Sequence, residues 1–94
     1  MIAYPKIQSV EPLQGKRLRV TFSTGVNKIY DCTSLLEEIP FAPLKDELLF
    51  RQVHADRTGY GVVWNDNIDL SESELWIHGA TEQGAEGDAV NRVP

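Results

Sequence analysis

Two carboxylates lie close together in the sequence, at Asp66 and Asp69, in and after a turn rich in Asn and Asp. Folding as a hairpin would bring this turn near His54 or Tyr60, and paired carboxylates can bind a hard cation or exchange protons. The alternative is that the turn residues bond to their own main chain, with Asp69 tying down the next element. The first interpretation predicts a small-ligand or metal-binding enzyme centred on Asp66, Asp69 and His54, whereas the second predicts no chemistry.

The other reactive side chains form no recognisable catalytic or metal-binding set. His54 and His78 lack the HxxxH or HExxH spacing of zinc ligands. The single cysteine, Cys32, has no partner for a disulfide or a CxxC site; it could be a nucleophile with His54 as base, or a buried inert thiol. We therefore expect no catalytic residue, no metal site and no cofactor, and we favour a binding role over an enzyme.

Aromatic residues near the same turn indicate where binding would occur. Trp64 and Tyr60 stand close to Asp66 and Asp69 in the sequence, and aromatic side chains often dominate the energy of interfaces. Ordinary core packing is the competing use of such residues. The predicted binding residues are Trp64, Asp66, Asp69 and Tyr60.

These residues need strands and short helices to position them. Alternating apolar residues and turn signals predict two β-hairpins, with a positive φ at Gly25 in the first. The predicted strands cover residues 6–10 (ended by Pro12), 17–22, 27–31, 51–56 and 60–64, and residues 68–70 lead out of the second hairpin.

Capping signals predict three short helices. Ser34 and Glu37 have the spacing of a capping box for a helix over 34–39, and Pro43 suits the first turn of a helix that ends near Phe50. Ser71 and Glu74 predict a helix over 72–78 that ends at Gly79.

Short connections favour an antiparallel arrangement, because parallel strands need longer crossovers. The expected fold is an α+β two-layer sandwich: a mainly antiparallel sheet of two hairpins with short helices on one face. Its predicted core is Leu18, Val20, Phe22, Ile29, Leu35, Leu36, Leu44, Leu48, Phe50, Val53, Val63, Trp64, Ile68 and Leu75.

Length and composition predict one domain. The chain has 94 residues, and we assign residues 1–79 to a single domain and residues 80–94, which are small and polar, to a flexible tail. Its apolar runs are too short to cross a membrane and no secretion signal is apparent, so we expect a cytoplasmic protein.

Charge bears on the partners. Nine Lys and Arg against fourteen Asp and Glu give a net charge of -5, which on average repels phosphate backbones. We therefore expect no direct nucleic-acid binding. An acidic domain suits a small basic protein partner, although the charge could serve solubility alone, and a free edge strand could support a weak homodimer.

A family resemblance rests on ordered segments of the chain: residues 20–25 (VTFSTG), 30–33 (YDCT), 44–46 (LKD) and 63–70 (VWNDNIDL), with Phe50 and Val53. Over roughly residues 7 to 79 the sequence resembles the bacterial domain-of-unknown-function family 2442. Asn67 departs from the pattern, since members usually have glycine there. The resemblance implies a two-layer fold without established catalytic residues. It also implies companions: some relatives accompany small basic proteins in an arrangement similar to toxin–antitoxin pairs, and others are fused to helix-turn-helix DNA-binding domains.

These observations favour a non-catalytic protein-interaction or regulatory module, such as an antitoxin-like companion of a small basic protein. The enzyme centred on the two carboxylates and His54 remains the alternative.

Overall fold

Two antiparallel sheets and several short helices form the molecule, which is a computed structural model that describes residues 3–82. The first sheet has the strand order β1-β2-β3-β7 and the second β4-β5-β6, so the single sheet expected from the sequence is divided in two. The strands are β1 (Ile7–Leu13), β2 (Arg17–Phe22), β3 (Asn27–Asp31), β4 (His54–Ala55), β5 (Gly61–Asn65), β6 (Ile68–Ser71) and β7 (Ala80–Thr81).

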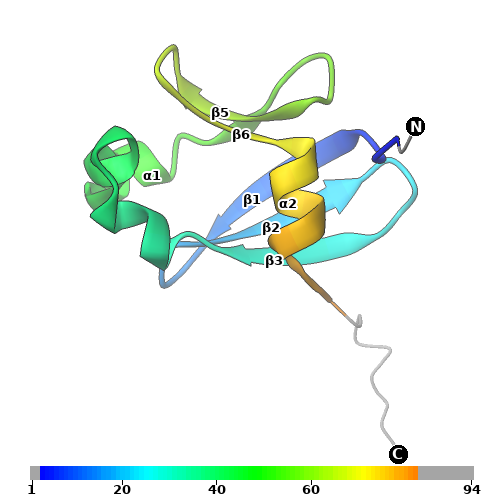
Figure 1. Cartoon of the computed structure of the whole chain (residues 1–94), viewed down its shortest axis with the longest axis horizontal. Coiled ribbons are helices and arrows are strands. Elements are labelled where there is room, and N and C mark those ends of the chain that lie inside the picture. The colour runs from blue at the N-terminus through cyan, green and yellow to red at the C-terminus, as the bar shows by residue number, and fades with distance from the viewer. Residues whose placement is uncertain (1–2, 83–94) are drawn as a thin grey trace, which may run out of the picture.

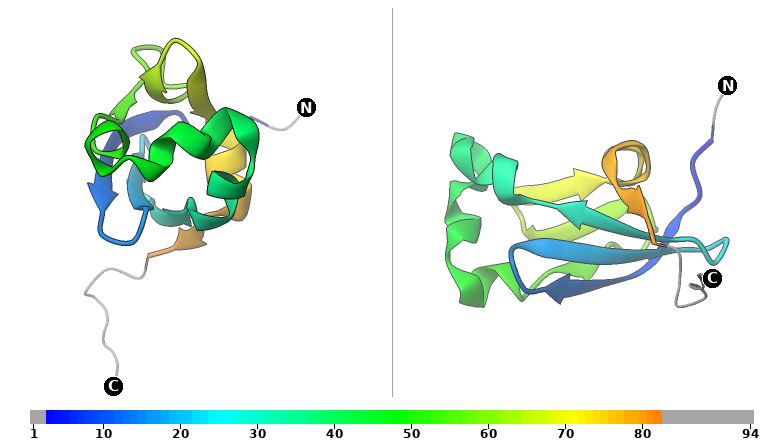
Figure 2. Two further views of the ribbon diagram at one scale, coloured as in Figure 1. Left: turned by 90° about the vertical axis from the view of Figure 1, so that its left-hand side faces the viewer. Right: turned by 90° about the horizontal axis from the view of Figure 1, so that it is seen from below.

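The helices are short and fall into two groups. They are η1 (Thr33–Glu37) and η2 (Ile39–Lys45), both 3-10 helices, and the α-helices α1 (Glu47–Phe50) and α2 (Glu72–His78). Figure 1 shows α2 lying across the β1–β3 sheet, while η1, η2 and α1 gather at one end of the molecule; the views in Figure 2 agree. Within residues 3–82, no helix has the length and apolar character needed to cross a membrane. The predicted α+β class is confirmed.

The first predicted hairpin is confirmed because its alternation matches a half-buried strand pair. Leu18, Val20 and Phe22 are fully buried on one face of β2. Strand β3 pairs with β2 from Arg17↔Asp31 to Thr21↔Asn27. Gly25 makes the reversal at a φ of 91°, a left-handed conformation that favours glycine.

Strand β1 is longer than predicted, because Pro12 does not end it. Pro12 lies opposite Leu18, and the strand continues to Leu13. β1 is the outermost strand of its sheet, and an edge strand tolerates the missing N–H of proline. The backbone N–H of Ile7 donates to the carbonyl oxygen of Gly59 at 2.8 Å, which ties this strand to the loop between β4 and β5.

The segment from Thr33 to Phe50 differs most from the prediction. Ser34 forms no capping box, and the segment divides into two 3-10 helices and a single α-helical turn. Proline at two positions of η2 limits the backbone donors available for α-helical bonds. Asp46 begins α1 instead, because its side chain accepts a hydrogen bond from the N–H of Leu48.

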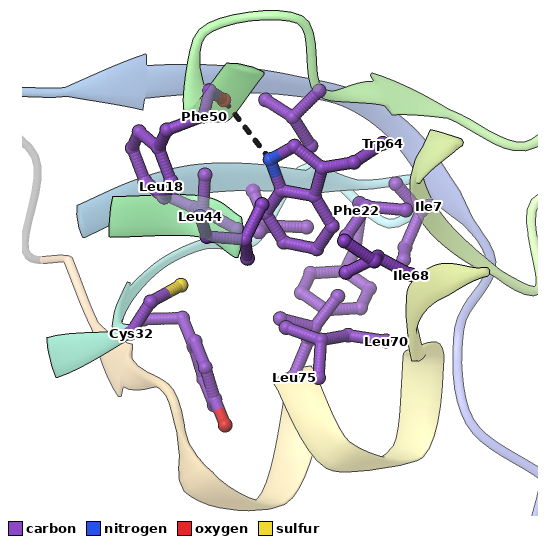
Figure 3. Close-up of a cluster of buried hydrophobic side chains, with 14 residues drawn as sticks. Ile7, Leu18, Phe22, Cys32, Leu44, Phe50, Trp64, Ile68, Leu70 and Leu75 are labelled. Carbon is purple, nitrogen blue, oxygen red and sulfur yellow. Dashed lines mark hydrogen bonds between the residues drawn. The ribbon is translucent and has the colours of Figure 1, made fainter. Parts of the chain in front are cut away.

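One core lies between the two sheets, α2 and the 3-10 segments (Figure 3). Leu48 was wrongly predicted to be buried and is 76% exposed, because it and Leu44 belong to different helices. Val62 is buried in place of Val63, since Val62 shares a strand face with Trp64. Ile29 is likewise only partly buried, while its neighbour Tyr30 is buried. The core residues are Ile7, Leu18, Val20, Phe22, Tyr30, Cys32, Leu44, Phe50, Val53, Val62, Trp64, Ile68, Leu70 and Leu75.

The last helix is confirmed at both ends. The Ser71 hydroxyl accepts a hydrogen bond from the N–H of Glu74 at 3.2 Å, as an N-cap should, and α2 ends before Gly79. The predicted tail begins at residue 80, yet Ala80 and Thr81 form β7 beside β3. The remainder of the predicted tail, residues 83–94, lies outside the described residues.

Candidate functional site

The turn that carries Asp66 is held by its own polar side chains. The amide oxygen of Asn65 accepts a hydrogen bond from the backbone N–H of Asn67 at 2.8 Å, which closes an Asx turn between β5 and β6. Asn67 keeps a negative φ, so the turn does not need the glycine that family members usually have there. Asp66 is exposed at this turn, and Asp69 is exposed further along β6.

His54 and the two carboxylates are not brought together. His54 on β4 and Asp69 on β6 pair with Val63 of β5 from opposite sides. Two strand spacings therefore separate them, about 10 Å. In the part of the chain that the structure describes, no three His, Cys, Asp or Glu side chains are placed to share a metal ion. The geometry thus gives the enzyme alternative no assembled centre among these residues.

The two aromatic residues predicted to bind a partner lie in different surroundings. Trp64 is 3% exposed, and its indole N–H donates to the carbonyl oxygen of Phe50 at 2.9 Å inside the core (Figure 3). Tyr60 is 56% exposed, with the Lys6 ammonium 4.6 Å from its ring centroid. Only Tyr60 of this pair presents its ring to solvent.

A groove of about 370 Å³ opens on the surface of the described residues. It lies between the 3-10 helices and the junction of β6 with α2. Leu35, Phe41 and Leu70 give it apolar walls. The remaining lining residues are polar or acidic: Glu38, Asp69, Ser71 and Glu74.

The carboxylates around the groove have unequal surroundings. The phenol of Tyr30 donates a hydrogen bond of 2.8 Å to Glu74. Burial raises the pKa of this phenol, and the bond to Glu74 raises it further, so Tyr30 stays neutral and can act as the donor. By contrast, neither Glu38 nor Asp69 forms a salt bridge with another of the described residues. Within residues 3–82, these two carboxylates therefore have no cationic partner.

Of the four predicted binding residues, the groove includes Asp69 alone. Sequence reasoning did not place Leu35, Glu38, Phe41 or Glu74 at a binding site. Leu35 was predicted as a core residue, Glu38 and Glu74 only as helix residues, and Phe41 was not singled out. They come from segments far apart in the chain, and no local pattern indicates that these segments meet. The spacing of Ser71 and Glu74 signalled a helix start, but not that the start borders a groove.

Two sheets with a covering helix define a small α+β domain with a groove on its surface. Comparison of sequences then places the chain: it belongs to the family described as protein of unknown function (DUF2442), whose model matches residues 7–80. The family resemblance predicted from the sequence is thereby confirmed. No curated protein matches the chain.

A solved structure also resembles the chain. The crystal structure of a candidate DNA-binding protein from Nitrosomonas europaea ATCC 19718 superimposes with a TM-score of 0.69 at 35% sequence identity. The match covers 83% of this chain and 52% of that one. Our chain therefore corresponds to about half of the protein from Nitrosomonas europaea.

This likeness corrects the expectation about partners. The net charge of -5 predicts no direct nucleic-acid binding, and this prediction is contradicted by a related protein that is described as DNA-binding. Net charge is a sum over the chain, whereas DNA contacts depend on local groups and on neighbouring domains. The comparisons support neither the small basic protein partner nor the homodimer.

Proposed function

We propose that this domain is a protein-interaction and regulatory module of a DNA-binding system. The observation that carries the proposal is the match to half of a protein described as DNA-binding, at 35% identity. In such a system the module would contact another domain or protein that binds DNA, and this contact would regulate the binding of that partner to DNA. It would act in the bacterial cytoplasm. An antitoxin-like role, implied by the family resemblance, is one specific form of this proposal and requires a toxin as the partner.

The surface chemistry supports a role in protein contacts. Arg19 forms ion pairs with Glu11 at 2.8 Å and with Glu82 at 3.0 Å. Lys16 and Arg51 both contact Glu47, at 2.6 Å and 3.3 Å. These cations already have carboxylate partners, while Glu38 and Asp69 in the groove have no Lys or Arg partner among the described residues. The groove therefore offers a partner both apolar walls and unpaired carboxylates.

Chromatin immunoprecipitation of the tagged chain in its native host tests this proposal. We expect enrichment at discrete genomic sites, because the module would be held there by the DNA-binding system to which it belongs. A tagged, unrelated cytoplasmic protein of similar size and charge serves as the control. Enrichment no greater than that control, in growth conditions where the chain is expressed, would contradict the proposal.

A further inference from the structure

Strand β6 has one edge without a partner strand. It is the terminal strand of the β4-β5-β6 sheet, and its ladder pairs it with β5 only. Within residues 3–82, no backbone hydrogen bond joins Ile68, Asp69 or Leu70 to a strand or loop on the opposite side. An edge of this kind offers N–H and C=O groups to any extended segment that can lie beside it.

The groove borders this same strand. Asp69, Leu70 and Ser71 supply one wall, and Leu35, Glu38 and Phe41 supply the facing wall. Side chains of an added strand would alternate between the two faces of the sheet. Those on the Leu70 face would meet the apolar groups of the groove, and those on the Asp69 face would lie beside an unpaired carboxylate.

Charge then indicates which segment fits. Three carboxylates and no Lys or Arg line the groove, and Glu38 and Asp69 have no cation among the described residues. Lys or Arg side chains in an incoming segment would complement them. A helical segment could cover the apolar walls, but it would leave the backbone of β6 unpaired.

We infer that an extended partner segment of alternating apolar and cationic side chains docks in this groove as an additional strand on β6. Backbone hydrogen bonds to β6 hold the segment, apolar side chains pack on Leu35, Phe41 and Leu70, and cationic side chains lie beside Glu38 and Asp69. The inference rests on the proposed function, because it identifies the surface through which the module contacts its partner. It concerns the docking segment alone, whatever the net charge of the whole partner.

Titration of the full, isotope-labelled chain with a short peptide of alternating Lys and Val tests the inference by NMR. We expect amide shifts at Leu35, Phe41 and Leu70, and slower amide hydrogen exchange along β6. The same peptide methylated on alternate backbone nitrogens keeps its charges and side chains but cannot form a strand ladder. It should bind roughly tenfold or more weakly, because several hydrogen bonds are lost. Equal binding of the two peptides would overturn strand addition.

Matched variants test the charges. Asp69→Asn and Glu38→Gln should each weaken binding of the Lys and Val peptide about two- to fivefold at low salt, as expected for exposed ion pairs. Asp66→Asn removes the same group from the same hairpin outside the groove and should leave the affinity unchanged. An equal loss of affinity in all three variants would overturn the placement in the groove. Pentylamine, which has the charge and alkyl chain of a lysine side chain but no peptide backbone, is a further control. If it shifts the amides of the same residues as much as the peptide does at the same concentration, the placement is also overturned.

The inference and the proposed function can fail separately. If the Asp69→Asn, Glu38→Gln double variant binds the Lys and Val peptide as tightly at low salt as the unchanged protein does, the groove is not the contact surface, although the proposed function stands. If the unchanged protein has no genomic sites, the proposed function fails whatever the peptide does.

Discussion

The indole N–H of Trp64 donates to the backbone carbonyl oxygen of Phe50 at 2.9 Å, and both side chains are buried. Their rings lie 6.1 Å apart between centroids, at an interplanar angle of 33°. Trp64 belongs to β5 and Phe50 to α1, so this pair joins the second sheet to the helical end of the molecule. A buried carbonyl that accepts from a side chain loses a partner when that side chain changes.

Replacing Trp64 by Phe should therefore destabilise the protein strongly. The substitution removes the donor to Phe50 and leaves a void, and we expect the free energy of unfolding to fall by about 2 to 4 kcal/mol. Urea denaturation followed by far-UV circular dichroism measures this loss. Trp76→Phe is the control, because Trp76 is only partly buried and packs edge-on against Phe22 at 5.0 Å. Equal losses in both variants would contradict the importance of the buried bond.

Gly61→Ala should disturb the β5–β6 hairpin. A Cβ at Gly61 would lie 2.5 Å from the carbonyl oxygen of Leu70 on the neighbouring strand. We expect a loss of about 1 to 3 kcal/mol in the free energy of unfolding, as for overpacked positions. Gly25→Asn is the comparison, since its site has open space and Asn tolerates a left-handed backbone. Thermal melts of both variants measure the difference, and a larger loss at Gly25 would contradict this account.

The thiol of Cys32 should be nearly inert in the folded protein. Burial raises the pKa of Cys32 to about 12, and the charge of Asp31 adds to the effect. Little thiolate exists at pH 8, so alkylation by iodoacetamide should be slow in buffer and fast in concentrated urea. Mass spectrometry over time gives both rates. A native rate close to that of a free cysteine would show that the thiol is accessible.

Stability should decline in acid partly through Asp31. The Thr33 hydroxyl and backbone N–H donate to its carboxylate and hold the pKa of Asp31 below its ordinary value. The folded state therefore binds this proton less readily than the unfolded state. The resulting stabilisation is full at neutral pH and is lost as pH falls below about 4 through the lowered pKa.

Thr33→Val should make this pH dependence shallower, since only the backbone N–H then favours the ionised carboxylate. Melting temperatures measured by circular dichroism between pH 2 and pH 7 would show it. Thr24→Val is the control, because Thr24 is an exposed turn residue without a carboxylate partner among the described hydrogen bonds. An unchanged pH dependence in Thr33→Val would contradict the role of the hydroxyl.

Elements specified by nearby residues could be predicted from the sequence. The alternation over Arg17–Phe22 and the Ser71 cap both act within one strand or one helical turn, and both were predicted correctly. Leu48 shows the limit of such patterns. It was predicted to lie in the core and in one helix with Leu44, but Asp46 starts a new helix between them and turns Leu48 outward.

The candidate site could hardly be predicted. Its facing walls come from residues 35–41 and 69–74, and they meet only because the helical segment folds back beside β6. Trp64 was predicted both as a binding residue and as a core residue, and its strand position directs it into the core. Burial of a single aromatic residue depends on the register of its strand, which a list of residue types does not specify.

The bond between Ile7 and Gly59 and the common core have a practical consequence for dissection of this molecule. A cut between α1 and β4 would leave two fragments. Each would carry part of the hydrophobic core, and neither could bury its apolar side chains alone. Such fragments should associate when mixed and regain structure together. This property would suit a two-piece reporter whose halves signal only after they have met in the cell.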